Sequence, residues 1–514
     1  MGFWLPSIAD IFFLCPFLLL TLKSGHSLLN DADTGYHIRT GEYIIKNFSV
    51  PRFDIFSSIT PPLPWVAHEW LSEVIMALVH RFSGLTGIVI FFSFFIGVAY
   101  FLLFAYARSL EFDLILATAV ALLATVSSAL HWLARPHIFS LVLTVVWYGI
   151  LNNYQYQGKD RLYLLPLLML LWVNLHGGFM LGFVLLGVYF TGALTALVAA
   201  EEARRKAAKK KCQKLAVITA LALLASLFNP RGYSILVYPF TIVSNNFLMD
   251  SVVEYVSPNF HQFLPYKYLL LLTIGVVAVS RKALDATDLM LLLLFTYMSL
   301  YSTRYIPLFA VIVTPIVLRQ LQGMVYGSTN RWTKFFKQRS KNLEFINASA
   351  RGHLWPAIAI AGVSALGLSG KIAFSFDPTK NPVAAVEFLK QEKLSGRMFN
   401  DDEFGDYVIY AAWPEYKVFF DGRSDMYGER WGKQYLAILK LQPGWEDIIA
   451  KNHFTWIFCG AGTPLSMVLM ENKNWHLIYA DKVAAIFVKD IPEYRSLIDK
   501  YPHVTMNKPR ELGS

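Results

Sequence analysis

The sequence is poor in charged residues. Only 16% of its 514 residues are Asp, Glu, Lys or Arg, whereas a soluble domain carries about 25%. Hydrophobic residues make up 55% of the chain, and aromatic residues make up 15%. This composition excludes an ordinary soluble domain and predicts a membrane protein.

Cysteine clusters and glycine-rich motifs are also missing from the sequence. The three cysteines, Cys15, Cys212 and Cys459, lie far apart, so the spacing supports neither a disulfide framework nor a CxxC metal site. No glycine-rich phosphate fingerprint follows any strand-like segment near the C-terminus. A nucleotide-binding domain is therefore not expected.

The positive charge of the chain lies outside its C-terminal part. The net charge is +10, and residues 374–514 hold 17 Lys/Arg against 19 Asp/Glu, so the remainder carries +12. Membrane proteins concentrate basic residues in their cytoplasmic loops. The surplus therefore predicts a membrane as partner and no nucleic acid.

Eleven apolar stretches approach the roughly 20 residues that span a bilayer core. The first has no Lys or Arg before it and contains Asp10, which favours a retained helix over a cleaved signal peptide. The predicted spans are residues 5–23, 84–107, 113–133, 138–154, 162–175, 178–199, 214–228, 267–280, 286–303, 305–321 and 355–372.

Two basic segments predict the orientation of these spans. Residues 201–214 and 319–352 each hold seven Lys/Arg, so both are expected in the cytoplasm. The N-terminus is then cytoplasmic and the C-terminus external. We expect a polytopic all-α membrane domain of about eleven helices over 1–373, placed in the bacterial inner membrane. Its first external loop covers 24–83, and a periplasmic domain covers 374–514.

The C-terminal part alternates helical and strand-like segments. Helices are predicted at residues 384–391, 435–440 and 445–450. Strands are predicted at residues 397–400, 416–421, 455–459, 476–480 and 484–488. This alternation predicts a small α/β domain.

The first external loop is rich in residues that carry chemistry. Asp31 and Asp33 have a spacing at which two carboxylates can share a divalent cation such as Mg²⁺ or Mn²⁺, or at which one can act as a base. The alternative is that both cap a surface helix. Residues 34–45 and 68–82 predict amphipathic helices in the membrane interface, with Trp65 and Trp70 at headgroup depth.

Three arginines lie at the outer ends of predicted spans, each near a proline: Arg135, Arg231 and Arg304. A guanidinium at this depth needs an anionic partner. The partner is either an acid such as Asp33, Glu69 or Glu254, or a lipid phosphate. Histidines at positions 131, 137 and 176 share the same depth, but their spacing matches no zinc ligand set, which favours structural roles.

Part of the first loop resembles a known superfamily. The run Asp31-Ala-Asp33-Thr-Gly-Tyr36-His37-Ile-Arg39 resembles the first external loop of GT-C membrane glycosyltransferases, above all oligosaccharyltransferase catalytic subunits. Residues 50–73 resemble a segment of bacterial GT-C-like membrane proteins whose acceptor is unassigned, and the likeness extends to bacterial glycosyltransferases that depend on polyprenyl-phosphate sugars. Phe404-Gly405-Asp406-Tyr407 resembles the WWDYG acceptor motif without its two tryptophans, so recognition of an Asn-x-Ser/Thr acceptor is not implied.

The resemblance implies a lipid-linked sugar donor, a glycan, lipid or protein acceptor, and inversion at the anomeric carbon. It implies a carboxylate base and cations that stabilise the leaving phosphate. The catalytic candidates are Asp33, Asp31 and Glu69. The donor-phosphate candidates are Arg304, Arg135, Arg231 and His137. The acceptor-side candidates are His68, His37, Asp406, Tyr407, Asp421 and Arg423.

Two other function classes remain open. A transporter or flippase of a lipid-linked glycan would use the same outer arginines, but it would need charged or broken helices near the membrane midplane. Apart from Asp10, the spans offer little ionisable content there. A scaffold or sensor would use the C-terminal domain, but it gives no reason for acids, histidines and arginines to gather on one face.

Overall fold

A computed structural model describes residues 4–245, 247, 249, 253–350 and 352–506. Its contacts divide the chain into two units. Unit 1 consists of Met1–Ser27, Ser83–Val243 and Met249–Ala373, and unit 2 consists of Leu28–Phe82, Ser244–Leu248 and Phe374–Ser514. The predicted first external loop therefore folds with the C-terminal segment.

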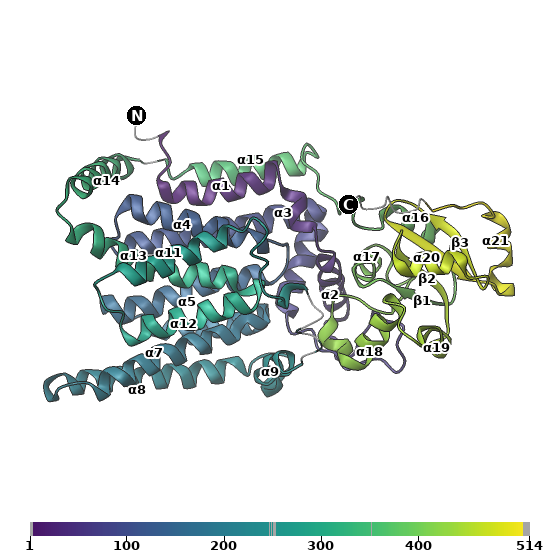
Figure 1. The fold of residues 1–514 in the computed structure, drawn as a ribbon, viewed down its shortest axis with the longest axis horizontal. Helices are drawn as coiled ribbons and strands as arrows, with labels where there is room; N and C mark the ends of the chain where they lie inside the picture. Colours follow the sequence, from purple (N-terminus) through teal and green to yellow (C-terminus); the bar gives the residue numbers. More distant parts are fainter. Residues whose placement is uncertain (1–3, 246, 248, 250–252, 351, 507–514) are drawn as a thin grey trace. The chain divides into compact units, whose positions relative to one another are not determined.

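Unit 1 is helical throughout its regular structure (Figure 1). The helix α3, Trp70–Ser109, enters this unit at a kink at Gly84, whose positive φ of 59° suits a residue without a Cβ. The other helices are α1 (Ile8–Leu22), α4 (Leu114–Ser128), α5 (His137–Gln157), α6 (Leu165–Leu175), α7 (Met180–Val198), α8 (Glu202–Ser226), α9 (Tyr238–Val243), α11 (Pro265–Val279), α12 (Ala286–Tyr301), α13 (Ile306–Gly327), α14 (Arg331–Ser349) and α15 (Trp355–Leu368).

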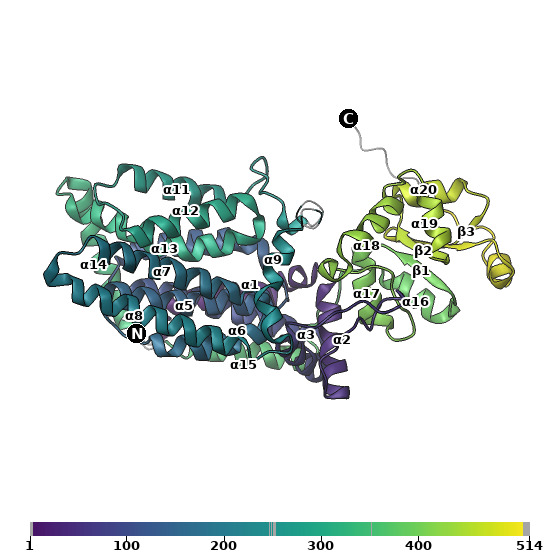
Figure 2. The same ribbon diagram turned by 90° about the horizontal axis from the view of Figure 1, so that it is seen from below.

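The helix α13 forms the centre of unit 1. It packs against α4, α5, α11 and α12, which run alongside it in both ribbon views (Figures 1 and 2). Its buried face runs without interruption from Phe309 to Leu318, because nearly every side chain there is apolar. Pro307 lies in the first turn, where a missing N–H costs no hydrogen bond.

Each of the eleven predicted spans overlaps a helix of unit 1. Among the described residues, four helical stretches are long and apolar enough to cross a membrane: Trp70–Ser109, Leu114–His131, Gly177–Val198 and Thr303–Gly327. Five more apolar helices are shorter. These helices indicate an integral membrane protein, while the number of crossings and their orientation stay predictions.

Both basic segments are more ordered than loops. Residues 201–214 form the first half of α8, and most of 319–352 belongs to α13 and α14. These segments form helices because many of their residues, Ala, Lys, Arg, Gln and Glu, have high helix propensity.

Unit 2 contains a four-stranded sheet with helices. Its strands are β1 (Arg397–Asn400), β2 (Phe454–Gly460), β3 (Trp475–Ala480) and β4 (Ala484–Lys489), in the order β1-β2-β4-β3. Only the β1–β2 pair is parallel. The helices are α2 (Asp33–Asn47), the start of α3, α16 (Val383–Glu392), α17 (Asp402–Ala412), α18 (Ser424–Leu439), α19 (Trp445–Lys451), α20 (Pro464–Glu471) and α21 (Arg495–Lys500).

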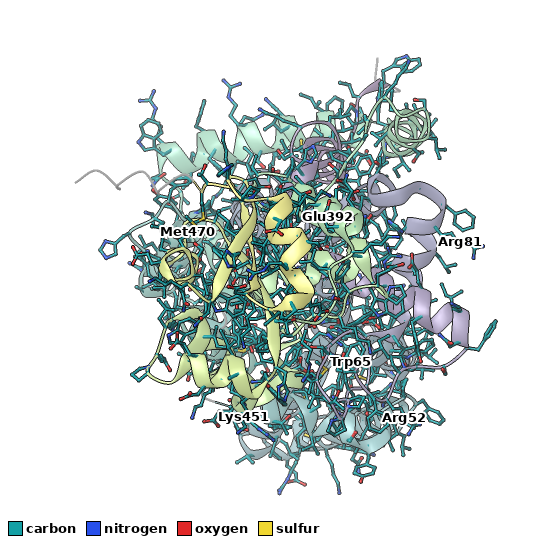
Figure 3. All side chains as sticks on the ribbon, turned by 90° about the vertical axis from the view of Figure 1, so that its right-hand side faces the viewer. Arg52, Trp65, Arg81, Glu392, Lys451 and Met470 are labelled. Carbon is teal, nitrogen blue, oxygen red and sulfur yellow. The ribbon has the colours of Figure 1, made fainter. Side chains whose placement is uncertain are left out.

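The core of unit 2 is largely aromatic. The rings of Phe420 and Tyr435 stack at 4.4 Å, and Phe399 packs on Tyr435 as well. At the edge of the unit, Glu392 (labelled in Figure 3) accepts hydrogen bonds from Lys500 Nζ and Tyr501 Oη. These bonds fasten the end of α21 to α16.

The predicted strand at 416–421 is wrong. This segment makes a single parallel bridge, from Val418 to Ser57. The side chain of Asn400 hydrogen-bonds to the backbone of this segment instead. It accepts from Phe419 N at 2.7 Å and donates to Phe420 O at 2.7 Å. A side chain that satisfies the backbone removes the need for a strand partner.

Candidate active site

Two glycines allow close packing around α2. A Cβ at Gly35 would lie 2.6 Å from the Cβ of Tyr410 in α17, and a Cβ at Gly41 would lie 1.9 Å from the carbonyl oxygen of Glu73 in α3. Any larger residue would push the helices apart. The helix α2 is thus held between α17 and α3, and Asp33 in its first turn reaches α17.

Asp33 meets Asp406 of α17, and both side chains are buried. Gly422 packs against this pair, and its N–H donates to both carboxylate oxygens of Asp406, at 3.2 and 3.1 Å. A Cβ at Gly422 would lie 2.1 Å from Asp33 Oδ1. Burial raises the pKa of Asp406 well above its ordinary value, and the hydrogen-bonded Asp33 carboxylate raises it further. The raised pKa favours the protonated form of Asp406 beside Asp33.

Arg423 is surrounded by acids and aromatic rings. It binds Asp421 with two nitrogens, at 2.7 and 2.6 Å, and its Nη1 donates to Asp54 at 2.8 Å. The indole of Trp65 lies 4.6 Å from the guanidinium carbon and Phe56 lies 4.9 Å from it. The side chain of Arg423 is only 2% exposed, so these acids supply the counter-charges that a buried cation requires.

Trp65 is buried against Arg423. The indole is 6% exposed and covers the guanidinium inside unit 2, so Trp65 contacts protein, and its depth in the membrane stays a prediction. The reason is that the face of an aromatic ring attracts a cation, most strongly when both are removed from water.

A second cluster lies one turn further along α2. His37 Nδ1 lies 3.3 Å from Glu73 Oε1, and its Nε2 lies 3.7 Å from Glu69 Oε2. His68 Nε2 lies 3.6 Å from the other oxygen of Glu69. His37 follows Asp33 by four residues, so both lie on one face of the helix. The structure thus brings His37, His68 and Glu69 together.

Tyr407 does not join these clusters. Its ring packs edge-on against Phe376 at 5.5 Å and lies beside Tyr410 at 6.2 Å. The helix α17 directs neighbouring side chains to different sides. Asp406 therefore faces Asp33, whereas Tyr407 belongs to an aromatic contact.

Asp31 supports the start of α2. Its Oδ1 accepts from the backbone N–H of Asp33 at 2.9 Å, whereas Asp33 lies inside the helix and makes no cap. The capping alternative therefore describes Asp31 but not Asp33. Among the described residues no group of three or more His, Cys, Asp or Glu could hold a metal ion. The predicted Mg²⁺ or Mn²⁺ at Asp31 and Asp33 stays a prediction, and we derive no step through a metal.

In unit 1 two of the three arginines at the ends of predicted spans converge on Glu254. Arg135 Nη1 lies 2.7 Å from Glu254 Oε1, and Arg304 Nη1 lies 3.7 Å from Glu254 Oε2. Burial alone would raise the pKa of Glu254, but Arg135 and Arg304 outweigh it and hold that pKa well below its ordinary value. The hydroxyls of Ser302 and Thr303 donate to the Glu254 carbonyl oxygen and hold the backbone in place.

Arg231 lies apart from this ion pair in its described contacts. Its guanidinium stacks on Tyr238 at 4.1 Å, and its Nη1 is buried without a hydrogen-bond partner among the described residues. The structure therefore brings Arg135 and Arg304 together and leaves Arg231 on its own aromatic support.

The three histidines of unit 1 make protein contacts. His137 Nε2 lies 2.9 Å from the carbonyl oxygen of His131, and their rings lie 4.4 Å apart. His176 Nδ1 accepts from Gly178 N at 2.9 Å and lies 2.7 Å from Ser140 Oγ. These contacts agree with structural roles, and the donor-phosphate role of His137 stays a prediction.

Asp10 lies in the first turn of α1. It forms a capping box with Ser7, accepting from the Ser7 backbone N–H at 2.9 Å and from its hydroxyl at 2.7 Å. His353 Nδ1 lies 3.0 Å from the same carboxylate. Asp10 therefore caps a helix end instead of interrupting the middle of a span.

Sequence reasoning missed Glu73 and Asp54 as site residues. Glu73 is 2% exposed, and its Oε2 has no hydrogen-bond partner among the described residues. One available signal was its spacing of four residues from Glu69, which places both acids on one helix face. For Asp54 there was no local signal, because its partner Arg423 lies 369 residues away.

No family model and no curated protein matches the sequence. Solved structures do match the fold. ArnT from Cupriavidus metallidurans, bound to undecaprenyl phosphate, aligns with a TM-score of 0.49 and 12% identity, over 95% of this chain and 98% of that chain. The arabinofuranosyltransferase AftD from Mycobacteria aligns with a TM-score of 0.49 and 11% identity, over 94% of this chain and 41% of that chain.

Proposed function

We propose that this protein is an inverting membrane glycosyltransferase that moves a sugar from a polyprenyl-phosphate- or diphosphate-linked donor to an acceptor. The observation that carries the proposal is the buried pair of Asp33 and Asp406. Sugar transfer from an activated donor needs a base for the acceptor and stabilisation of the departing anion. The chain offers residues suited to each task.

Asp33 acts as the base. We assign the negative charge of the pair to Asp33, because burial and the neighbouring Asp33 carboxylate raise the pKa of Asp406. Asp33 accepts the proton of an acceptor hydroxyl, and the acceptor oxygen forms a bond to the anomeric carbon. The bond from that carbon to the phosphate oxygen breaks, and its electron pair leaves with the phosphate. A single displacement of this kind inverts the anomeric carbon.

Arg304 and Arg135 bind the phosphate of the donor. Arg304 is 28% exposed, so a ligand can reach it, and its guanidinium fork matches phosphate oxygens. Both arginines already hold one anion, the carboxylate of Glu254. A site that binds a carboxylate through guanidinium groups has the chemistry required for a phosphate.

The transporter or flippase alternative would need charged or broken helices near the midplane of the spans. Asp10, the ionisable residue that the sequence offered inside a span, belongs to the capping box of α1. The alternative therefore gains no support from Asp10.

The test is Asp33→Asn in the purified full chain, reconstituted in liposomes with a polyprenyl-phosphate-linked sugar and an acceptor that the wild-type protein uses. Release of polyprenyl phosphate should fall by at least about a hundredfold, the usual contribution of a general base, because the amide keeps the shape and loses the charge. Asp499→Asn, at an exposed position of α21, is the matched control and should retain full activity. Undiminished release by folded Asp33→Asn protein would remove Asp33 from the mechanism.

A further inference from the structure

A cavity of about 280 Å³ lies in unit 2, close to the lower limit of about 300 Å³ for small-molecule sites. It is lined by residues of α19, of the turn between α20 and β3, of β3 and of β4. None of these residues is among the site candidates above. The lining residues are Trp445, Glu446, Asp447, Ile449, Ala450, Asn472, Asn474, Trp475 and Lys489.

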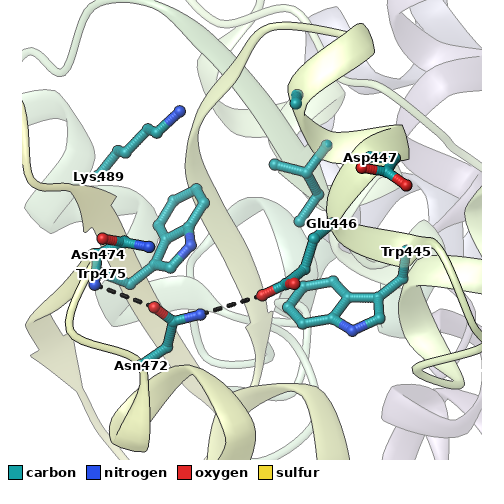
Figure 4. A pocket seen from close by; sticks show the side chains of 9 residues that line it. Trp445, Glu446, Asp447, Asn472, Asn474, Trp475 and Lys489 are labelled. Atoms are coloured by element: carbon teal, nitrogen blue, oxygen red, sulfur yellow. Dashed lines mark hydrogen bonds between the residues drawn. The ribbon is translucent and has the colours of Figure 1, made fainter.

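Two tryptophans flank the cavity. Figure 4 shows the indoles of Trp445 and Trp475 on opposite sides, with Glu446 and Asn472 between them. Trp475 is 9% exposed and belongs to the aromatic core, so it is held rigidly, while Trp445 is half-buried and packs against the same core. An indole offers a flat apolar face and one N–H donor.

The polar groups between the indoles are fixed in place. Asn472 Nδ2 donates to Glu446 Oε1 at 3.3 Å, and Asn472 Oδ1 accepts from the backbone N–H of Asn474 at 3.0 Å (Figure 4). A side-chain amide has two N–H donors, and the described contacts of Asn472 use one of them. Its orientation is therefore set while a donor remains for a ligand.

The lining selects one class of ligand. An apolar molecule would leave the amide and carboxylate groups of the cavity without partners. An anion would face Glu446 and Asp447 with only Lys489 to balance them. A neutral sugar matches both features, because its ring has apolar faces of C–H groups and an edge of hydroxyls that donate and accept.

We propose that this cavity binds a neutral saccharide. Trp445 and Trp475 contact the apolar ring faces, and Asn472 and Glu446 bind the hydroxyls.

The experiment measures saccharide binding to the full-length protein in detergent. Maltotriose, cellotriose, xylotriose and chitotriose are titrated by saturation-transfer NMR, which the 13 tryptophans of the chain do not obscure. At least one trisaccharide should bind, and Trp445→Ala should weaken it by about tenfold or more, which corresponds to about 1.4 kcal/mol. Trp332→Ala, at an indole of α14 that is 81% exposed, is the control and should bind as wild type does.

If Trp445→Ala fails to fold, Glu446→Gln and Asn472→Ala test the same cavity in the same titration. Asn472→Ala removes the donor and should weaken binding, while Glu446→Gln keeps the shape and loses a charge-assisted acceptor. The proposal is overturned if none of the four trisaccharides binds, if inorganic phosphate or glucose 6-phosphate competes better than they do, or if both Trp445→Ala and Asn472→Ala bind normally. Asp33→Asn protein should bind the trisaccharide unchanged, so loss of sugar transfer and loss of this site are separate results.

Discussion

Two ion-pair clusters in this chain differ in charge and in exposure: one has two acids around an arginine, and the other has two arginines around an acid. In unit 2 the guanidinium of Arg423 lies between Asp54 and Asp421, and the three side chains are at most 2% exposed. In unit 1 Glu254 lies between Arg135 and Arg304, and these side chains are 17–28% exposed. In the buried (closed) cluster, a ligand could replace one partner only by leaving another charge buried without a counter-charge. In the partly exposed (open) cluster, water can reach the charge that loses its partner. Breaking the closed cluster should therefore destabilise the fold, and the open cluster is the one suited to a ligand.

The strongest test of this contrast is Arg423→Met. It removes the only guanidinium that the described contacts give to Asp54 and Asp421, so two buried carboxylates lose their counter-charge. We expect a loss of about 3–5 kcal/mol in the free energy of unfolding. Denaturant unfolding followed by circular dichroism measures it. Arg430→Met, at an exposed position of α18, should cost little, and equal stability of the two variants would show that burial does not decide the effect.

In the open cluster Arg304→Ala should affect binding more than stability. Binding of a short-chain polyprenyl phosphate should weaken by roughly 2–5 kcal/mol, as for other interfacial charge pairs. Lysine should restore little of it, because an ammonium lacks the bidentate fork. Calorimetry on detergent-solubilised protein gives the affinity, with exposed Arg281→Ala as control. Normal affinity combined with lower stability would assign Arg304 a purely structural role.

Glu254→Gln has a smaller expected effect of the opposite sign. If the carboxylate occupies the place of the donor phosphate, its neutral isostere should bind polyprenyl phosphate more tightly, by about tenfold or 1.4 kcal/mol. If Glu254 instead orients Arg135 and Arg304, the same change should weaken binding. The direction of the change in affinity, measured in the same titration, decides between these roles.

Asp401 differs from the acids of both clusters because its described contacts include no cation. Its Oδ2 accepts from Gly460 N at 2.7 Å, its Oδ1 has no described partner, and burial above all raises the pKa of Asp401 to about 7. In the unfolded chain the Asp401 carboxyl loses its proton near pH 4. Protonated Asp401 therefore contributes fully to the free energy of unfolding below about pH 4, and this contribution is lost as the pH rises through about 7.

Asp401→Asn should therefore gain stability relative to wild type between pH 5 and pH 8. The gain should be the smallest effect of the series, about 1 kcal/mol, because the hydrogen bond from Gly460 N stabilises the carboxylate and offsets part of the cost of its burial. Thermal unfolding of both proteins at the two pH values measures it, with exposed Asp499→Asn as control. A constant difference between variant and wild type would contradict the raised pKa.

The membrane class, the helices of unit 1 and most elements of unit 2 follow from the sequence itself. Hydropathy and helix propensity act over 10–20 neighbouring residues, so all eleven predicted spans overlap helices and four of the five predicted strands are present. The strand at 416–421 failed because Asn400, 19 residues from Phe419, takes up its backbone groups.

Only the tertiary structure decided how the candidate site is assembled. Asp33 and Asp406 lie 373 positions apart, and the close packing of α2 at Gly35 brings them together. The sequence singled out Asp33 and the outer arginines from their neighbours, and it named Glu254 as one acid that could pair with an arginine. It could not choose among the acids, because ion pairs and hydrogen bonds between distant residues depend on packing, whereas helices and spans depend on residues close in the chain.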